Sequence, residues 1–191
     1  MNIGIFSGSF NPIHIGHLIL ANYMTEFTEI DEIWFLVSPH NPLKEESGLI
    51  EEDKRLEMVR IALEDYPKFI ASDFEFSLPR PSYTIYTLEQ LEKAYPGNKF
   101  TLIIGSDNWT SFDKWKSYEK ILENYAIKVY PRLGYRISIP SKQKTYVEAV
   151  DAPVIEISST FIRESVNDGK NIKAFLPENV YQYIIDNNLY K

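Results

Sequence analysis

The chain of 191 residues contains no cysteine. This absence excludes a disulfide framework, a thiolate zinc site and a cysteine nucleophile, and it fits a protein expected in the cytoplasm. Histidine is scarce, with three residues. No apolar run approaches the length of a membrane span. The first residues, MNIGIFSGSF, lack the basic start and long apolar core of a signal peptide, so we expect neither an anchor nor a leader.

An excess of positive charge is also missing. The formal net charge is -7 and the sequence pI is about 5.1, which argues against binding to nucleic acid or to a membrane surface. Local cations and helix N-termini can still hold an anionic small molecule. Hydrophobic residues make up 44% of the chain, enough for a sizeable core. We expect a single domain over 1–191 with a small helical subregion at about 158–191, and a homo-oligomer is compatible with this.

Short apolar runs alternate with helical patterns along the chain. The runs IWFLV (33–37) and FTLII (100–104) lack polar alternation, as is typical of parallel strands covered on both faces. The alternation predicts an α/β fold, a Rossmann-like, right-handed, doubly wound parallel sheet with helices on both faces. We expect strands at 3–6, 33–37, 69–72, 100–104, 126–130 and 154–157, and helices at 18–24, 53–63, 84–95, 109–123, 158–168 and 177–189.

Residues suited to ligand binding follow these strands. Doubly wound sheets bind ligands at the carboxyl ends of their strands, where the strand order reverses. We therefore expect one site that gathers the residues standing after the strands: Gly8, His14, His17, His40, Lys44, Gly105, Asp107, Arg132 and the segment 158–163.

The stretch FSGSFNPIHIGH (6–17) joins the first strand to the first helix. Gly8 lets main-chain N–H groups approach a ligand, and Pro12 stiffens the loop. His14 and His17 can donate hydrogen bonds to phosphate oxygens beside the positive end of the helix dipole. A tight turn with histidines as polar caps explains the same residues, and this motif alone leaves the choice open. A zinc site on His14, His17 and His40 is a weaker alternative, because oriented carboxylates that would support it are not evident.

Two further stretches have a functional and an ordinary interpretation. The segment ISSTFIR (157–163) offers hydroxyls, helix N–H groups and Arg163 for phosphate, but also describes a serine-capped helix with a surface arginine. Around RPSYTIYTL (80–88) and GSDNW (105–109), an aromatic and hydroxyl-bearing pocket could hold a flat ring, although tryptophans mostly pack in cores. The candidates for that pocket are Tyr83, Thr84, Trp109 and Trp115. Asp107 is a candidate contact to a ribose or to metal-bound water, with a helix cap as the alternative.

Taken together, these stretches resemble the nucleotidylyltransferase superfamily, whose H-x-G-H motif is also found in class I aminoacyl-tRNA synthetases. Here that motif reads His14-Ile15-Gly16-His17, within GSFNPIHIGH, and ISSTFIR is similar to the second phosphate motif of the superfamily. The segment SYTI with TL, together with GSDNW and Trp115, resembles nicotinate or nicotinamide mononucleotide adenylyltransferases. The resemblance extends from the first strand to Arg163.

The resemblance implies transfer of AMP from ATP to nicotinate mononucleotide, giving nicotinate adenine dinucleotide and pyrophosphate. His14, His17 and Arg163 would be catalytic, and Mg²⁺ would be bound mainly through the ATP phosphates. The implied contacts to ATP are Gly8, Ser9, Phe10, Gly105, Asp107, Ser158 and Ser159. The implied contacts to the mononucleotide are Lys44, Tyr83, Thr84, Trp115 and Arg132.

Three positions depart from the pattern of the resembled family. Tyr86 stands where an acidic residue is expected, HNPLK (40–44) replaces the commoner P-P-H-K, and YPRLGY (130–135) matches R-P-G-Y loosely. The choice between nicotinate and nicotinamide forms stays open. Two rival functions also stay open, an adenylyltransferase for another small phosphate substrate such as phosphopantetheine, and a non-catalytic nucleotide sensor.

Overall fold

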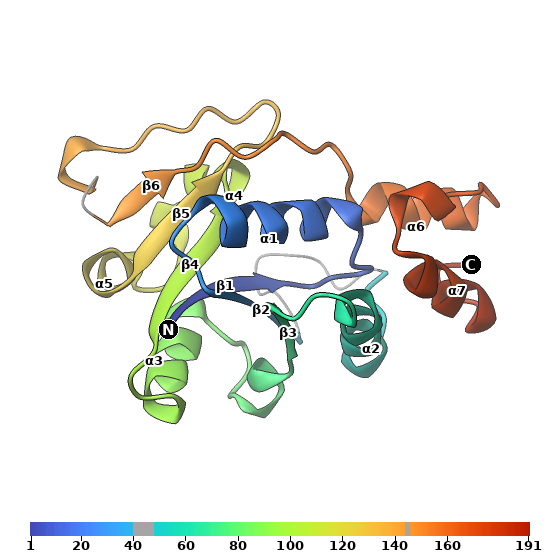
Figure 1. The fold of residues 1–191 in the computed structure, drawn as a ribbon, viewed down its shortest axis with the longest axis horizontal. Helices are drawn as coiled ribbons and strands as arrows, with labels where there is room; N and C mark the ends of the chain where they lie inside the picture. Colours follow the sequence, from blue (N-terminus) through green and yellow to red (C-terminus); the bar gives the residue numbers. More distant parts are fainter. Residues whose placement is uncertain (40–47, 144–145) are drawn as a thin grey trace.

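The structure, a computed structural model, describes residues 1–39, 48–143 and 146–191. Its six described strands form one parallel sheet in the order β3-β2-β1-β4-β5-β6 (Figure 1). The strands are β1 (Asn2–Gly8), β2 (Glu32–Val37), β3 (Phe69–Ser72), β4 (Lys99–Gly105), β5 (Ala126–Tyr130) and β6 (Val147–Ala149). The order reverses between β1 and β4, so the crevice for a ligand lies at the carboxyl ends of these two strands.

Helices connect the strands and end the chain. The α-helices are α1 (Ile15–Phe27), α2 (Glu52–Leu63), α3 (Thr84–Ala94), α4 (Ser106–Thr110), α5 (Tyr118–Asn124), α6 (Ser159–Asn167) and α7 (Glu178–Asp186). Short 3₁₀ turns occur at η1 (Phe74–Ser77), η2 (Phe112–Lys114), η3 (Ser141–Gln143) and η4 (Lys173–Phe175). In Figure 1, α6 and α7 lie together at one end of the molecule, next to α1 and α2.

Two hydrophobic cores cover the two faces of the sheet. Successive residues of a strand point to opposite faces, and in β1 Ile5 packs into one core while Phe6 packs into the other. The Phe6 core includes residues of α1, α2, α6 and α7. The Ile5 core includes residues of α3 and α5. Helices on both faces confirm the predicted Rossmann-like, doubly wound fold.

The prediction of a strand at 154–157 was wrong. These residues form no ladder, and Val154 is 49% exposed. The sheet edge is taken instead by β6, which pairs with β5 through Ile127 and Val147. Its sequence, VEA, has one buried apolar residue followed by two exposed ones, so it carries too little apolar pattern to be recognised as a strand.

The predicted helix at 109–123 is divided into α4, η2 and α5. Ser117 precedes α5 with a left-handed backbone, φ 51°, a conformation that a continuous right-handed helix does not contain. Because of this interruption, Trp115 lies between η2 and α5 and not within a helix, and it lines a cavity.

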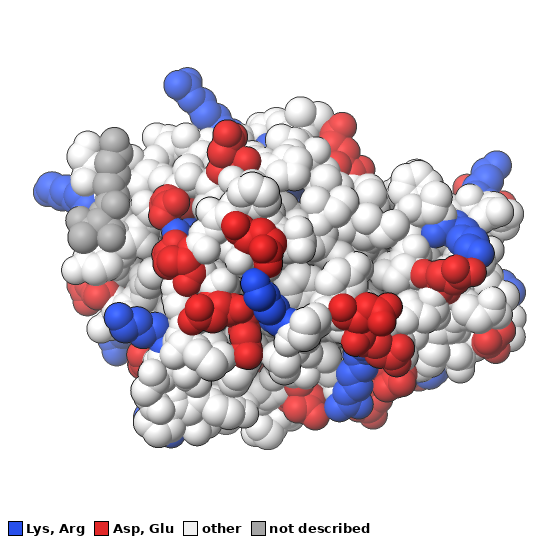
Figure 2. Space-filling model, viewed as in Figure 1, with Lys and Arg blue, Asp and Glu red and all other residues white. Residues whose placement is uncertain are grey.

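The surface of the molecule carries mixed charge. Figure 2 shows acidic and basic side chains interspersed over the visible face, in line with the net charge of -7. Within the described ranges, no helix has the length and apolar character needed to cross a bilayer.

Candidate active site

A cavity of about 640 Å³ lies at the point where the strand order reverses. Its walls come from the end of β1, the end of β4, the start of α3 and the segment after η2. A volume of this size suits a small-molecule ligand. Among the predicted site residues, those lining this cavity are Gly8, Ser9, Tyr83, Thr84, Gly105 and Trp115.

The two histidines of the first motif stack at the start of α1. Their ring centroids are 3.7 Å apart and the rings are inclined by 28°. The backbone N–H of His14 donates to Nδ1 of His17 at 3.2 Å. Because Nδ1 of His17 accepts this bond, a neutral His17 carries its proton on Nε2. The helix cap therefore fixes the tautomer of His17.

His14 is held in its neutral form. It is 4% exposed, and burial, together with the positive charge of Arg132, lowers its pKa from 6.5 to about 3. None of the described residues pairs with its Nδ1 atom. A Cβ at Gly16 would lie 3.0 Å from that atom, so glycine at this position leaves room for the His14 ring.

Phe10 supports the loop from within the core and does not line the cavity. It has a left-handed backbone, φ 44°, and its ring is 2% exposed. The ring lies over Gly8, where an added Cβ would approach it to 3.2 Å. It also meets the ring of His17 edge-on, with centroids 5.1 Å apart. Phe10 thus fixes the positions of Gly8 and His17.

The segment 158–163 is distant in sequence from the loop that joins β1 to α1, but it contacts this loop in the fold. Ser158 caps α6 as predicted, accepting from the N–H of Phe161 at 3.1 Å. Ser159 donates to the carbonyl of Pro12 at 2.8 Å, and Arg163 donates to the carbonyl of Asn11 at 2.9 Å. The two motifs singled out in the sequence therefore lie together, although Ser158, Ser159 and Arg163 do not line the cavity.

Gly105, Asp107 and Arg132 lie together at the ends of β4 and β5. Oδ1 of Asp107 is buried, has no hydrogen-bond partner among the described residues and lies 3.7 Å from Nε of Arg132. A Cβ at Gly105 would fall 2.3 Å from the same oxygen, so glycine is needed there. The N–H of Arg132 donates to Oγ of Ser106 at 2.8 Å.

The start of α3 and the ring of Trp115 form another part of the cavity wall. Tyr83 caps α3 without a side-chain hydrogen bond. Nε1 of Trp115 is buried without a partner in the described chain. Trp109 packs on Phe112 and donates to the carbonyl of Ser138 at 3.0 Å, so its role is packing. Tyr86 is 47% exposed and is not part of the wall.

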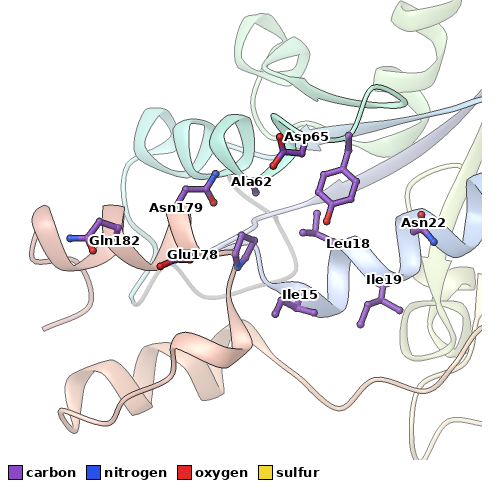
Figure 3. Close-up of a pocket in the computed structure, with 11 residues that line it drawn as sticks. Ile15, Leu18, Ile19, Asn22, Ala62, Asp65, Glu178, Asn179 and Gln182 are labelled. Atoms are coloured by element: carbon purple, nitrogen blue, oxygen red, sulfur yellow. The ribbon is translucent and has the colours of Figure 1, made fainter.

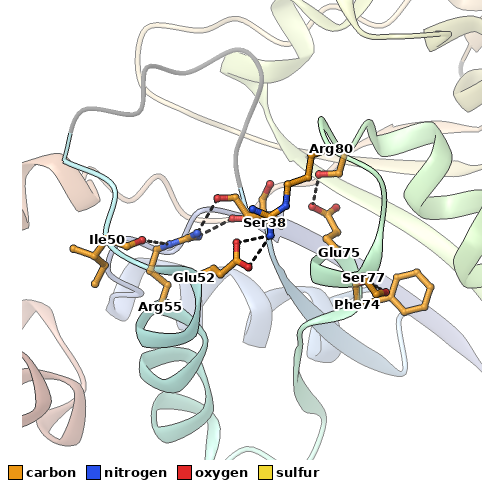
Figure 4. Close-up of polar contacts among 10 residues, drawn as sticks. Ser38, Ile50, Glu52, Arg55, Phe74, Glu75, Ser77 and Arg80 are labelled. Carbon is orange, nitrogen blue, oxygen red and sulfur yellow. Dashed lines mark hydrogen bonds and ion pairs between the residues drawn. The ribbon is translucent and has the colours of Figure 1, made fainter.

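Arg55 is a buried residue near the site that the sequence analysis missed. It is 1% exposed, and its guanidinium donates to the carbonyls of Ile50, Ser9, Ser38 and Pro39 at 2.7 to 3.0 Å. Figure 4 shows it between the start of α2 and the loops that follow β1 and β2. Arg55 therefore joins the loops that follow β1 and β2.

Glu75 and two lysines were also missed. Glu75 is 4% exposed and lines the cavity, while Lys114 and Lys116 line it on either side of Trp115. Glu75 lies in a short segment without a helical or strand period, and Lys114 and Lys116 lie in the predicted helix 109–123, so the sequence carried no signal that these three side chains face a cavity.

Two predicted residues lie outside the described part of the chain. Lys44 and His40 fall in the range 40–47, so neither the lysine contact nor a site on three histidines is tested. Among the described residues, no cluster of three histidine, aspartate or glutamate side chains could hold a metal ion.

A second hollow, of about 910 Å³, contains none of the predicted site residues. Figure 3 shows side chains of α1, including Leu18 and Ile19, facing the end of α2 and the start of α7 across it. Its position away from the carboxyl ends of the strands leaves the smaller cavity as the candidate active site.

Comparisons with known proteins identify the family of the chain. The sequence profile of the cytidylyltransferase-like family matches residues 5–165. A Bacteroides fragilis protein named "Probable nicotinate-nucleotide adenylyltransferase" is 55% identical over 182 residues, covering 95% of this chain and 90% of the relative. A Flavobacterium johnsoniae protein of the same name is 52% identical, covering 100% of both chains.

A solved structure shows the same fold. The Plasmodium falciparum nicotinic acid mononucleotide adenylyltransferase, in complex with NaAD, matches with a TM-score of 0.82 and 24% identity, covering 99% of this chain and 97% of that one. The profile match spans both the motif at 14–17 and the segment 157–163, and the two bacterial relatives cover 95% and 100% of the chain. The chain therefore belongs to the cytidylyltransferase-like family, within its group of nicotinate-nucleotide adenylyltransferases.

Proposed function

We propose that the protein transfers AMP from ATP to nicotinate mononucleotide, releasing pyrophosphate. The observation that carries the proposal is a cavity at the β1–β4 switch point that is lined by Gly8 and Gly105 as well as by Thr84 and Trp115. A ligand in it would contact both the nucleotide motif and the wall suited to a flat ring. The relatives at 52% and 55% identity bear the name of this activity.

The reaction needs positioned donors and no nucleophilic side chain. The mononucleotide phosphate attacks the α-phosphorus of ATP in line, so catalysis consists of alignment and stabilisation of charge on the phosphoryl oxygens. His17, with its proton on Nε2, would donate to these oxygens, and neutral His14 stands beside it. Arg163 and Ser159 would hold the outgoing pyrophosphate, and Arg132 would add positive charge near the reacting phosphates.

The ring end of the cavity suits a nicotinate group. Thr84 is the first residue of α3, an 11-residue helix, and it lines the cavity with Trp115. The start of a helix presents free N–H groups and a partial positive charge, which favour a carboxylate over a neutral amide. Trp115 would stack on the pyridine ring, while Lys114 and Lys116 add charge that attracts an anionic substrate.

Magnesium enters this proposal with ATP. Mg²⁺ keeps several water ligands and binds mainly to substrate phosphates. Oδ1 of Asp107 is buried and has no hydrogen-bond partner among the described residues, so it is an acceptor that suits a magnesium-bound water or a ribose hydroxyl. Lys44 would contact the mononucleotide phosphate. The proposal also places the enzyme in the cytoplasm, where its substrate ATP is available.

The product identifies the reaction. The protein is incubated with Mg²⁺, nicotinate mononucleotide and ATP labelled at the α-phosphate. The products are then separated and identified by mass spectrometry. Label in nicotinate adenine dinucleotide, with one pyrophosphate released per dinucleotide, supports the proposal. ATP that binds without any turnover would instead support a nucleotide sensor.

A further inference from the structure

Glu75 is a buried carboxyl group surrounded by hydroxyls. Its Oε1 accepts from Thr87 at 3.1 Å and from Ser7 at 3.5 Å, and its Oε2 accepts from Ser82 at 3.2 Å. Ser38 adds a further hydroxyl bond. The four partners come from the end of β1, the loop after β2, the residues before α3 and the first turns of α3.

No cation balances this carboxyl group in the part of the chain that the structure describes. Arg80, the arginine of the following loop, pairs with Glu52 at 2.7 Å instead (Figure 4). Burial raises the pKa of Glu75 above its usual value. Burying a carboxyl group without a cation is costly, and an apolar side chain would fill such a position at lower cost for folding alone. The presence of a carboxyl group at position 75 therefore points to a role in the site and not in folding alone.

Three of the four partners of Glu75 are themselves part of the cavity wall. Ser7, Ser38 and Ser82 line the cavity with Glu75, and Tyr83 and Thr84 follow Ser82 directly. Thr87 lies one turn further along α3, so Glu75 holds both the approach to this helix and its first turn. The start of α3 is thereby fixed relative to the ends of β1 and β2.

We propose that Glu75 is a positioning residue for the mononucleotide end of the site, where it fixes the start of α3 against β1 and β2. This inference rests on the proposed function, because it assigns that end of the cavity to the pyridine mononucleotide. Glu75 acts through Ser82 and Thr87 and does not touch the reacting phosphates.

Glu75→Ala leaves three or more hydroxyls without their acceptor and opens space beneath the start of α3. We expect its Kd for nicotinate mononucleotide to rise about tenfold or more, since small displacements of positioning groups have large effects, while its Kd for ATP stays within about twofold of the wild type. Glu75→Gln keeps one oxygen acceptor and offers Ser82 a donor, so we expect a rise within about threefold.

Three further proteins serve as comparisons. Ser82→Ala removes one of the bonds at an accessible position, and it should weaken mononucleotide binding in the wild type but add nothing in the Glu75→Ala background. Asp73→Asn is the matched control, because this acidic residue lies two positions earlier with an exposed side chain, 3.7 Å from Arg60. It should bind both substrates as the wild type does.

Titration calorimetry with nicotinate mononucleotide and with ATP decides between the outcomes. Selective loss of mononucleotide binding in Glu75→Ala and Ser82→Ala supports the inference. If the wild type binds no mononucleotide, the proposed function and the inference fall together. If the wild type binds it and both variants bind equally well, the inference alone is overturned. Equal weakening of ATP binding also overturns it, because the effect is then not specific to that end.

Discussion

The two ring nitrogens of His17 have different roles, so a substitution can remove the proposed substrate contact and keep the hydrogen bond to His14. Its Nδ1 accepts the His14 N–H, and its Nε2 is the atom proposed to meet the phosphates. Asparagine offers an acceptor near the place of Nδ1 and nothing at the place of Nε2. We expect His17→Asn to lower kcat by about 10² to 10³, the usual cost of one lost transition-state donor, while it keeps an acceptor for the N–H of His14.

His17→Ala is the companion variant for this measurement. It should lose the same activity and additionally about 1 kcal/mol of stability, because the cap acceptor is gone as well. Steady-state kinetics and thermal unfolding of both variants test the assignment. Near-normal kcat in His17→Asn would contradict the phosphate role.

His14 predicts a pH dependence of stability. Its folded-state pKa of about 3 lies below the unfolded value of 6.5, so the unfolded state binds the proton more readily. The stabilisation is complete above pH 6.5 and is lost as pH falls toward 3, by up to about 1.4 kcal/mol per pH unit. Urea unfolding between pH 7.5 and 5 measures this loss.

The matched variant for that titration is His14→Asn, which places a favoured N-cap residue at the start of α1 and removes the imidazole. The stability difference between wild type and variant should shrink as the pH falls below 6.5. A difference that is constant over this range would show that His14 is not held neutral in the folded protein.

At the scale of residues, the sequence revealed side chains that stand in recognisable motifs. Gly8, Thr84 and Trp115 were predicted and line one cavity. Arg55 and Glu75 were not, because a charged residue in a helical or irregular stretch is ordinarily at the surface. Only the fold shows that loop carbonyls surround Arg55 and hydroxyls surround Glu75.

At the scale of elements, Arg55 joins α2 to the loops after β1 and β2. Arg55→Met fills a similar space but leaves four carbonyls without their donor. We expect a loss of about 2 to 4 kcal/mol, since unpaired buried polar groups are costly. Urea unfolding monitored by tryptophan fluorescence measures it.

Arg60→Met is the control on the same helix. Arg60 is half exposed, and its ion pairs with Glu57 and Asp73 are 3.8 and 3.7 Å long. Surface pairs of this kind contribute little, so the change should stay within about 0.5 kcal/mol. Equal effects of the two substitutions would contradict the role given to Arg55.

Several of the elements that were predicted correctly have a strong apolar signal, although the weaker strand predicted at 69–72 also became β3. The runs IWFLV and FTLII became β2 and β4, and the helix predicted at 53–63 became α2. Strand β6 was missed because its few residues are mostly exposed. The helix predicted at 109–123 is interrupted in the structure, because its apolar spacing carries no information about the left-handed backbone of Ser117.

At the scale of the whole molecule, residues near the C-terminus contact the loop that joins β1 to α1. The hydroxyl of Tyr190 donates to Oδ1 of Asn11 at 2.9 Å, and Arg163 donates to the carbonyl of the same residue. Tyr190→Phe removes one of these bonds and leaves Asn11 less well held. We expect the KM for ATP to rise about three- to tenfold, with a stability loss of about 1 kcal/mol.

Tyr146→Phe is the control for this substitution. Tyr146 is 53% exposed and stands next to β6, which Figure 1 places at the opposite end of the molecule from α7. It should leave the KM for ATP unchanged. A Tyr190→Phe variant with the same KM for ATP as this control would show that the C-terminal contact does not affect nucleotide binding.

Substrate choice tests whether one cavity brings ATP and a nicotinate ring together. Pyrophosphate release from ATP and Mg²⁺ is measured side by side with nicotinate mononucleotide, nicotinamide mononucleotide and phosphopantetheine. The helix start at Thr84 predicts release with the pyridine mononucleotides only, and a higher kcat/KM for the nicotinate form. Release with phosphopantetheine, or the absence of release with both pyridine mononucleotides, would contradict the assignment of Thr84 and Trp115.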